Sequence, residues 1–181
     1  MLTRSLPPSA WPDLHGLHIC IIEDNDDTRV LLSDVLQHCG AMVMTYDRAD
    51  AAMADLREFV PSIFVCDLAM PGLDGLQFIR RIRALPPERG GAIPAVAITA
   101  FYEDYARAAV EAAGFNAYLI KPVRIDELCQ LVLRLADLSG YMEAAKQDKR
   151  ALRREDLVHC FIRPYFEPGF HGALLARCIL Q

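Results

Sequence analysis

The stretch Ile63-Phe64-Val65-Cys66-Asp67-Leu68-Ala69-Met70-Pro71-Gly72 sets an acidic residue at the end of a short apolar run. Such a run predicts a buried strand, and an acid at its end is costly to bury unless the acid is used. In an open sheet of parallel strands, ligands bind in the crevice at the carboxyl ends of the strands. Asp67 is therefore the first candidate for a reactive residue.

Around this stretch, from residue 17 to about 138, short β-branched runs alternate with helical patterns, which is typical of parallel βαβ units. The expected strands are 17–22, 41–46, 62–66, 93–98 and 117–120. The expected helices are one ending before Gly40, then 49–60, 73–84, 102–113 and one from Ile125 onward. The pattern predicts a doubly wound five-stranded parallel sheet with helices on both faces, whereas strand order does not follow from it.

The chain outside this region predicts two appendages. Residues 1–16 are expected to form a loose leader, with Trp11 docking onto the domain. Residues 139–181 are expected to form a C-terminal helical extension of unknown role, because 141–157 is compatible with a helix. The extension also carries apolar side chains that need a cover, against the domain or against a partner. They are Phe161, Ile162, Tyr165, Phe166 and Phe170.

Composition and charge restrict the class of protein. The chain has 181 residues and is 53% hydrophobic, with a mean hydropathy of +0.17, values typical of a globular protein. No apolar run approaches the roughly 20 residues of a membrane-spanning helix, and residues 1–13 lack a secretory signal, so a cytoplasmic location is expected. The net charge of −5 argues against nucleic-acid binding, which needs clustered Lys and Arg.

The cysteines and histidines show no pattern of a metal site. The cysteines lack a C-x-x-C spacing, and four of them lie in apolar patterns that predict buried free thiols. Those four are Cys20, Cys39, Cys66 and Cys129, and the other two are Cys160 and Cys178. The histidines are expected to be surface or packing residues. They are His15, His18, His38, His159 and His171.

Polar residues of complementary chemistry end four of the expected strands. They are Glu23-Asp24, Asp67, Thr99 and Lys121. Three carboxylates in one crevice need a counter-charge, which Mg²⁺ and the Lys121 ammonium provide. The set suits phosphoryl transfer onto a carboxylate, in which Asp67 attacks phosphorus and Thr99 hydrogen-bonds a phosphoryl oxygen.

Four motifs carry a resemblance to a known family. They are Ile21-Ile22-Glu23-Asp24-Asn25, Cys66-Asp67-Leu68-Ala69-Met70-Pro71-Gly72-Leu73-Asp74-Gly75, Ala97-Ile98-Thr99-Ala100 and Tyr118-Leu119-Ile120-Lys121-Pro122. In order and spacing, residues 17–138 resemble the receiver domain of bacterial two-component response regulators. The resemblance implies a flavodoxin-like fold.

The resemblance also implies a function for the site. Asp67 would take a phosphoryl group from a phosphohistidine on a sensor histidine kinase or histidine phosphotransfer protein. Mg²⁺ would be held by Asp24, Asp67 and the backbone carbonyl of Ala69, with Glu23 contributing directly or through water. Thr99 and Lys121 would contact the phosphoryl group.

A switch is implied as well, in which Tyr118 turns inward as Thr99 moves and so changes the surface formed by the fourth helix, fifth strand and fifth helix. The protein would then be a phosphoacceptor and not an enzyme in the usual sense, with self-catalysed phosphorylation and dephosphorylation left open. An alternative for Tyr118 is a ring packed in the core with its hydroxyl in water.

Several alternatives for the whole chain stay open. A stand-alone receiver would signal through protein contacts with a downstream target that the sequence does not name. The lead-in His15-Gly16-Leu17 also resembles that of receivers in hybrid kinases, so a detached hybrid-kinase receiver or a phosphorelay intermediate is an alternative. A homodimer through the fourth helix, fifth strand and fifth helix, or through 139–181, is left open. An aspartyl-phosphate phosphatase is disfavoured, because haloacid-dehalogenase-like enzymes carry an acid where this chain has Ala69.

Two departures from the family pattern lead to one prediction. Glu23-Asp24 stands where two aspartates are frequent, which lengthens one ligand arm. Ala69 and Phe101 lie two residues beyond Asp67 and Thr99, positions that in the family flank the path of hydrolytic water. Because alanine cannot orient water and phenylalanine can shield the acyl phosphate, a long-lived phosphorylated state is predicted.

Overall fold

The computed structural model describes residues 11–56, 59–100 and 105–147, with side-chain burial described as far as 137. The strands are β1 (His18–Ile22), β2 (Met42–Tyr46), β3 (Ile63–Asp67), β4 (Ala95–Thr99) and β5 (Ala117–Ile120). The helices are α1 (Asp26–His38), α2 (Ala49–Asp55), α3 (Gly75–Arg83), α4 (Arg107–Ala113) and α5 (Ile125–Gln147), with a short 3-10 helix η2 (Pro87–Arg89) before β4. The sheet lies in a compact unit, Met1–Asp137.

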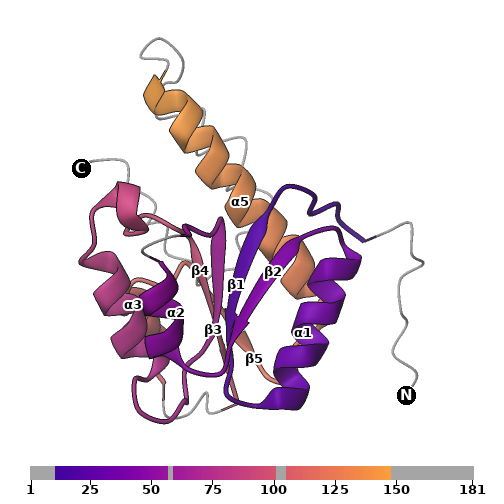
Figure 1. The fold of residues 1–181 in the computed structure, drawn as a ribbon, viewed down its shortest axis with the longest axis vertical. Coiled ribbons are helices and arrows are strands. Elements are labelled where there is room, and N and C mark those ends of the chain that lie inside the picture. The colour runs from indigo at the N-terminus through magenta and orange to yellow at the C-terminus, as the bar shows by residue number, and fades with distance from the viewer. Residues whose placement is uncertain (1–10, 57–58, 101–104, 148–181) are drawn as a thin grey trace. The chain divides into compact units, whose positions relative to one another are not determined.

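The five strands are all parallel and are ordered β2-β1-β3-β4-β5 (Figure 1). The predicted five-stranded parallel sheet is therefore confirmed. The chain leaves β1 in one direction to form β2 and returns on the other side to form β3. This reversal of strand order is where open sheets of this kind bind ligands, at the carboxyl ends of the strands.

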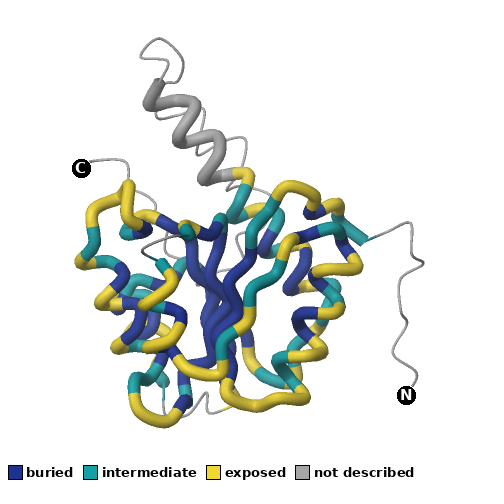
Figure 2. The backbone as a smooth tube through the Cα atoms, viewed as in Figure 1, coloured by how far each residue is buried: buried dark blue, intermediate teal, exposed yellow. Residues whose placement is uncertain are grey.

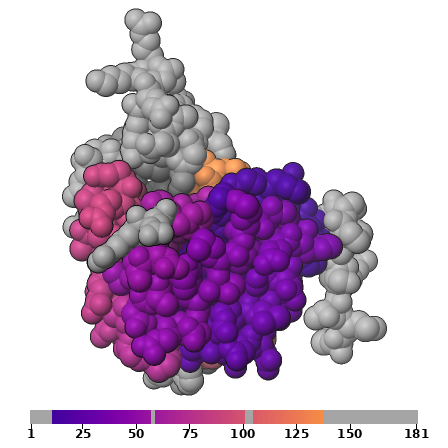
Figure 3. Space-filling view, in the orientation of Figure 1, coloured from indigo at the N-terminus to yellow at the C-terminus, as the bar shows by residue number. Residues whose placement is uncertain are grey.

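Helices cover both faces of the sheet, and each face has its own apolar core. Phe64 and Cys66 of β3 pack in the core under α2, α3 and α4, whereas Ile63 and Val65 pack in the core under α1 and α5. Every residue of β3 and β4 is buried, as expected for central strands covered on both sides (Figure 2). The face toward the viewer in Figure 3 consists mainly of the indigo and purple residues of the first half of the chain. The edge strand β2 keeps exposed residues.

Helix starts follow local capping chemistry. Asn25 caps α1, its side-chain oxygen accepting from the amide of Thr28 at 2.9 Å. Asp74 caps α3 in the same way, so α3 begins at Gly75 and not at residue 73 as predicted. The predicted helix 102–113 is too long among the described residues, because Tyr105 and Ala106 precede α4, which begins at Arg107, while residues 102–104 lie outside the described part of the chain.

The leader prediction needs a correction for its last residues. Leu14 is fully buried in the core under α1 and α5, and its amide donates to the carbonyl of Cys39 at 2.8 Å. Trp11 docks onto the domain as expected, with its ring edge-on to that of His38. This part of the leader is held because Leu14 completes the apolar core. The remaining leader residues, 1–10, lie outside the described residues.

Two further differences concern helix ends. The helix predicted to reach residue 60 ends as α2 at Asp55, and residues 57–58 are outside the described part of the chain. The last helix, α5, runs on to Gln147. The rest of the predicted extension, residues 148–181, lies outside the described part of the chain, and so does Phe101. The predicted buried free thiols at Cys20, Cys39, Cys66 and Cys129 are confirmed.

Candidate functional site

An acidic cluster lies at the carboxyl ends of β1 and β3. Carboxylate oxygens of Glu23, Asp24 and Asp67 all lie within 4.8 Å of one another. The sheet register brings them together, because β1 and β3 are neighbours and their last paired residues are Ile22 and Cys66. Glu23 and Asp67 are buried, at 1% and 6% exposure, whereas Asp24 is exposed.

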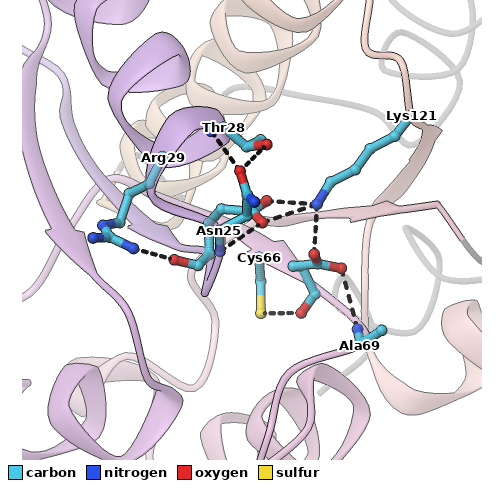
Figure 4. A network of polar contacts seen from close by, with 8 residues as sticks. Asn25, Thr28, Arg29, Cys66, Ala69 and Lys121 are labelled. Carbon is cyan, nitrogen blue, oxygen red and sulfur yellow. Dashed lines mark hydrogen bonds and ion pairs between the residues drawn. The ribbon is translucent and has the colours of Figure 1, made fainter.

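One lysine pairs with the two buried acids of the cluster (Figure 4). Lys121 Nζ lies 2.5 Å from Asp67 Oδ2, 2.9 Å from Glu23 Oε1 and 2.8 Å from Glu23 Oε2. Burial raises the pKa of Glu23; the hydrogen bond from Lys121 offsets part of this rise and the nearby Asp67 charge adds to it, so the pKa stays above its ordinary value. Burial alone would lower the pKa of Lys121, but its hydrogen bonds to Asp67 and Glu23 outweigh that effect and raise it. The site is therefore short of positive charge.

The residues of this cluster fit a hard divalent cation. Three carboxylates face one ammonium group, and oxygen-rich sites of that kind suit Mg²⁺. Glu23 Oε2, although close to Lys121 Nζ, makes no hydrogen bond to any described residue. A buried carboxylate oxygen without a donor is stabilised by a cation. No other group of metal-ligating side chains is found in the described ranges.

The turn after β3 is fixed by two backbone contacts. The amide of Ala69 donates to Asp67 Oδ1 at 3.1 Å, and the amide of Gly75 donates to the carbonyl of Leu68 at 3.0 Å. A β-carbon on Gly75 would lie 2.4 Å from the Asp67 carbonyl oxygen and 2.9 Å from the Leu68 α-carbon, both backbone atoms. Because glycine has no side chain, Gly75 lets the start of α3 approach the backbone of Asp67 and Leu68 closely. The sequence analysis did not predict this role. Its signal in the sequence is a glycine directly after the capping residue Asp74.

Thr99 and Tyr118 lie on the strands next to Asp67. Thr99 ends β4, is fully buried and follows Ile98, the register partner of Asp67. Its carbonyl accepts from the amide of Lys121 at 2.8 Å, which ties the end of β4 to the lysine. The peptide bond that follows Lys121, to Pro122, is cis.

The Tyr118 ring packs against the core under α2, α3 and α4. Its hydroxyl is buried and makes no hydrogen bond to any described residue, so the alternative in which this hydroxyl is wet is wrong. Burial raises the pKa of Tyr118.

Comparison with known proteins identifies the family. The model of the response regulator receiver domain matches residues 19–133. The chain therefore belongs to the response regulator receiver domain family, the phosphoacceptor modules of two-component signal transduction. Receiver domains of this family act with histidine kinases or phosphotransfer proteins and hold Mg²⁺ in an acidic pocket.

Individual relatives show how far the similarity extends. An uncharacterised 14.6 kDa protein of Leptolyngbya boryana is 40% identical over 119 residues, which are 66% of this chain and 89% of that protein. The cyclic di-GMP phosphodiesterase response regulator RpfG of Xanthomonas campestris pv. campestris is 34% identical over 142 residues, 77% of this chain and 36% of RpfG. The chain thus spans about a third of RpfG's length.

A solved structure gives the same fold. The receiver domain of sensor histidine kinase PA1611 from Pseudomonas aeruginosa PAO1 is 29% identical, with a TM-score of 0.62, covering 67% of this chain and 98% of that domain. In that structure a magnesium ion is coordinated in the active-site cleft. Across the described ranges of the present chain, no helix is long and apolar enough to span a bilayer.

Proposed function

We propose that Asp67 accepts a phosphoryl group from a phosphohistidine, so that this chain works as a cytoplasmic phosphoacceptor and not as an enzyme with a separate substrate. The observation that carries the proposal is the 2.5 Å pairing of Asp67 with Lys121 inside a cluster of three carboxylates. A buried carboxylate held beside a single ammonium group is a nucleophile with a charge partner ready for the incoming phosphoryl oxygens.

Glu23, Asp24, Asp67 and the Ala69 carbonyl would hold Mg²⁺, which supplies positive charge to the phosphoryl oxygens when bound. In the transfer, an Asp67 carboxylate oxygen forms the new bond to phosphorus while the bond from phosphorus to the histidine nitrogen breaks. The imidazole leaves with that electron pair and takes up a proton. Lys121 would then move its hydrogen bond from the carboxylate to a phosphoryl oxygen, and the Thr99 hydroxyl would donate to another.

Occupancy of the site would be reported through Thr99 and Tyr118. The Tyr118 hydroxyl is buried without a hydrogen bond to the described residues, a cost that an alternative rotamer can relieve. If phosphorylation draws Thr99 toward Asp67, the space beside β4 and β5 changes and favours that second arrangement. The face of α4, β5 and α5 would carry the change to a downstream protein or to a second copy of the chain.

The donor would be a sensor histidine kinase or a histidine phosphotransfer protein. Similarity to the receiver domain of a sensor histidine kinase supports the alternative of a detached hybrid-kinase receiver or phosphorelay intermediate. The absence of an acidic side chain at Ala69 argues against a phosphatase, because no residue at that place can protonate a leaving alcohol.

A small donor with a phosphorus–nitrogen bond tests the proposal without a known kinase. The full chain is incubated with phosphoramidate and Mg²⁺, and covalent modification is read by intact mass. One phosphoryl group per chain is expected with Mg²⁺ and none with excess EDTA. Modification that is equally fast with EDTA would contradict the role given to the acidic cluster.

A further inference from the structure

Arg29 lies near the start of α1 and points back to the end of β1 (Figure 4). Its Nη1 donates to the backbone carbonyl of Glu23 at 2.8 Å, and its Nη2 donates to Asp26 Oδ1 at 2.5 Å. Only 19% of the Arg29 side chain is exposed, although the next residue, Val30, is exposed. A charged donor directed at one peptide carbonyl fixes that peptide group in place.

The peptide group that Arg29 contacts is the one that leads to Asp24. Asp24 is the exposed member of the acidic cluster, and its side chain makes no hydrogen bond to the described residues. Its position is therefore set by the backbone on either side. On one side the Glu23 amide donates to the Tyr46 carbonyl at 3.0 Å and the Glu23 carbonyl accepts from Arg29. On the other side Asn25 is held as the cap of α1.

We propose that Arg29 is a positioning residue for the metal site: it fixes the Glu23–Asp24 peptide group and so holds the Asp24 carboxylate beside Asp67 before the ion binds. The inference rests on the proposed function. Three carboxylates within 4.8 Å repel one another, and the exposed one escapes most easily by turning into water. A hydrogen bond that opposes this movement lowers the cost of assembling the site and so strengthens ion binding.

A purely structural role predicts a different result. The first turn of α1 already has its cap in Asn25, whose side-chain oxygen accepts from both the amide and the hydroxyl of Thr28 at 2.9 Å. The Arg29 pair with Asp26 is one turn of helix apart and its acid is 83% exposed, an arrangement that contributes little to stability. If Arg29 only supported the helix, its loss would not change Mg²⁺ affinity.

The test compares Arg29→Met and Arg29→Lys with the matched control Asp26→Asn, which removes the ion pair but leaves the bond to Glu23. Mg²⁺ is titrated into the full chain without a phosphoryl donor, and affinity is read from the amide NMR shifts of Asp24 and Asp67. Phosphorylation by acetyl phosphate is then measured against Mg²⁺ concentration. Arg29→Met is expected to weaken Mg²⁺ binding about 10- to 100-fold, the range for a lost hydrogen bond from a charged donor.

The same factor should appear in the Mg²⁺ concentration for half-maximal phosphorylation, while the rate at saturating Mg²⁺ stays within about twofold of wild type. Arg29→Lys should fall between wild type and Arg29→Met, because a lysine side chain is shorter and its ammonium lacks the planar fork with which the guanidinium reaches the Glu23 carbonyl. Asp26→Asn should match wild type.

The outcomes separate this inference from the proposed function. A wild-type chain that neither binds Mg²⁺ nor takes up phosphate overturns the proposed function itself. Normal wild-type behaviour with unchanged Mg²⁺ affinity in Arg29→Met overturns the positioning role alone, as does a slower saturated rate at unchanged affinity. If Arg29→Met does not fold by circular dichroism, Arg29→Lys decides, and wild-type affinity in that variant overturns the inference.

Discussion

Lys121 Nζ lies 2.5 Å from Asp67 Oδ2, which joins the residue after β5 to the last residue of β3 across the intervening strand β4. The same ammonium also pairs with buried Glu23. Without a metal ion, this lysine is the cation that makes burial of both acids tolerable. If Lys121 also contacts the incoming phosphoryl group, as proposed, phosphorylation and the stability of the sheet edge depend on the same contact.

Lys121→Met should destabilise the chain in EDTA by about 2 to 4 kcal/mol, since it leaves two buried carboxylates without their partner. Mg²⁺ should restore part of that loss because it supplies charge to the same oxygens. The free energy of unfolding is measured in urea with and without Mg²⁺. Arg124→Met, which removes an exposed cation, is the control and should change little. Equal effects of the two substitutions would show that the Lys121 pair does not hold the site.

Glu23→Gln should make the metal-free chain more stable at neutral pH. Burial raises the folded-state pKa of Glu23 above its ordinary value of 4.5, so the folded state binds this proton more tightly than the unfolded state. The stability that Glu23 contributes is therefore full below about pH 4.5 and is lost as pH rises through the raised pKa. Glutamine does not titrate and avoids that loss.

As pH rises from 4 toward 8 in EDTA, the free energy of unfolding of Glu23→Gln should consequently increase relative to that of wild type. The increase is about 1.4 kcal/mol for each unit by which the folded-state pKa of Glu23 is raised. Urea unfolding at a series of pH values measures it. Glu88→Gln, on the exposed turn η2, reports the effect of deleting a surface carboxylate. A difference that does not change with pH contradicts the burial effect on Glu23.

Gly75→Ala should impair both stability and phosphorylation. The added β-carbon would lie 2.4 Å from the Asp67 carbonyl oxygen, so either α3 or the end of β3 must move, at a cost of about 1 to 3 kcal/mol. Unfolding in urea and the phosphorylation rate with acetyl phosphate are the two readouts.

Gly16→Ala is the control for that prediction. Gly16 has a φ of +82°, and a β-carbon added there would have no atom within 4 Å, so alanine at this position is strained without a clash. Its stability should fall by about 1 kcal/mol while phosphorylation is unchanged. Normal phosphorylation in Gly75→Ala would mean that the close approach does not position Asp67.

Ala69→Asn should shorten the lifetime of the phosphorylated state. The wild-type residue is half-buried just after Asp67 and has no polar group to orient a water molecule. A carboxamide there can hold water near the acyl phosphate, and positioned proton transfer of this kind accelerates hydrolysis by about tenfold or more. The purified phosphoprotein is followed by intact mass with time. Loss of the wild-type phosphoryl group within seconds would contradict the long-lived state.

Much of the fold and of the candidate site can be predicted from the sequence, because strand ends and side-chain chemistry are both local. Asp67 and Lys121 each follow a readable apolar run, and parallel strands bring such ends to one edge of the sheet. The Asn25 cap is equally local. Strand order was not predictable, because it depends on which faces pack together and not on any one segment.

The contacts that the sequence analysis missed are tertiary ones. Leu14 lies in a proline-rich leader with no periodic pattern. Its burial depends on packing in the core under α1 and α5, which the leader sequence alone does not show. Arg29 has the pattern of a surface helix residue, and only the position of the β1 end shows that it contacts the Glu23 carbonyl. Tyr105 packs against the core two residues before α4 begins at Arg107, a tertiary contact that the helical pattern of the sequence does not show.

The most direct test of the central claim is the phosphorylation of Asp67 itself. Wild type, Asp67→Asn and the matched surface control Asp50→Asn are incubated with acetyl phosphate and Mg²⁺ and read by intact mass. The account predicts one phosphoryl group on wild type and on Asp50→Asn, and none on Asp67→Asn. An adduct that persists in Asp67→Asn, or a wild type that takes up none while binding Mg²⁺, would contradict the role of Asp67 as phosphoacceptor.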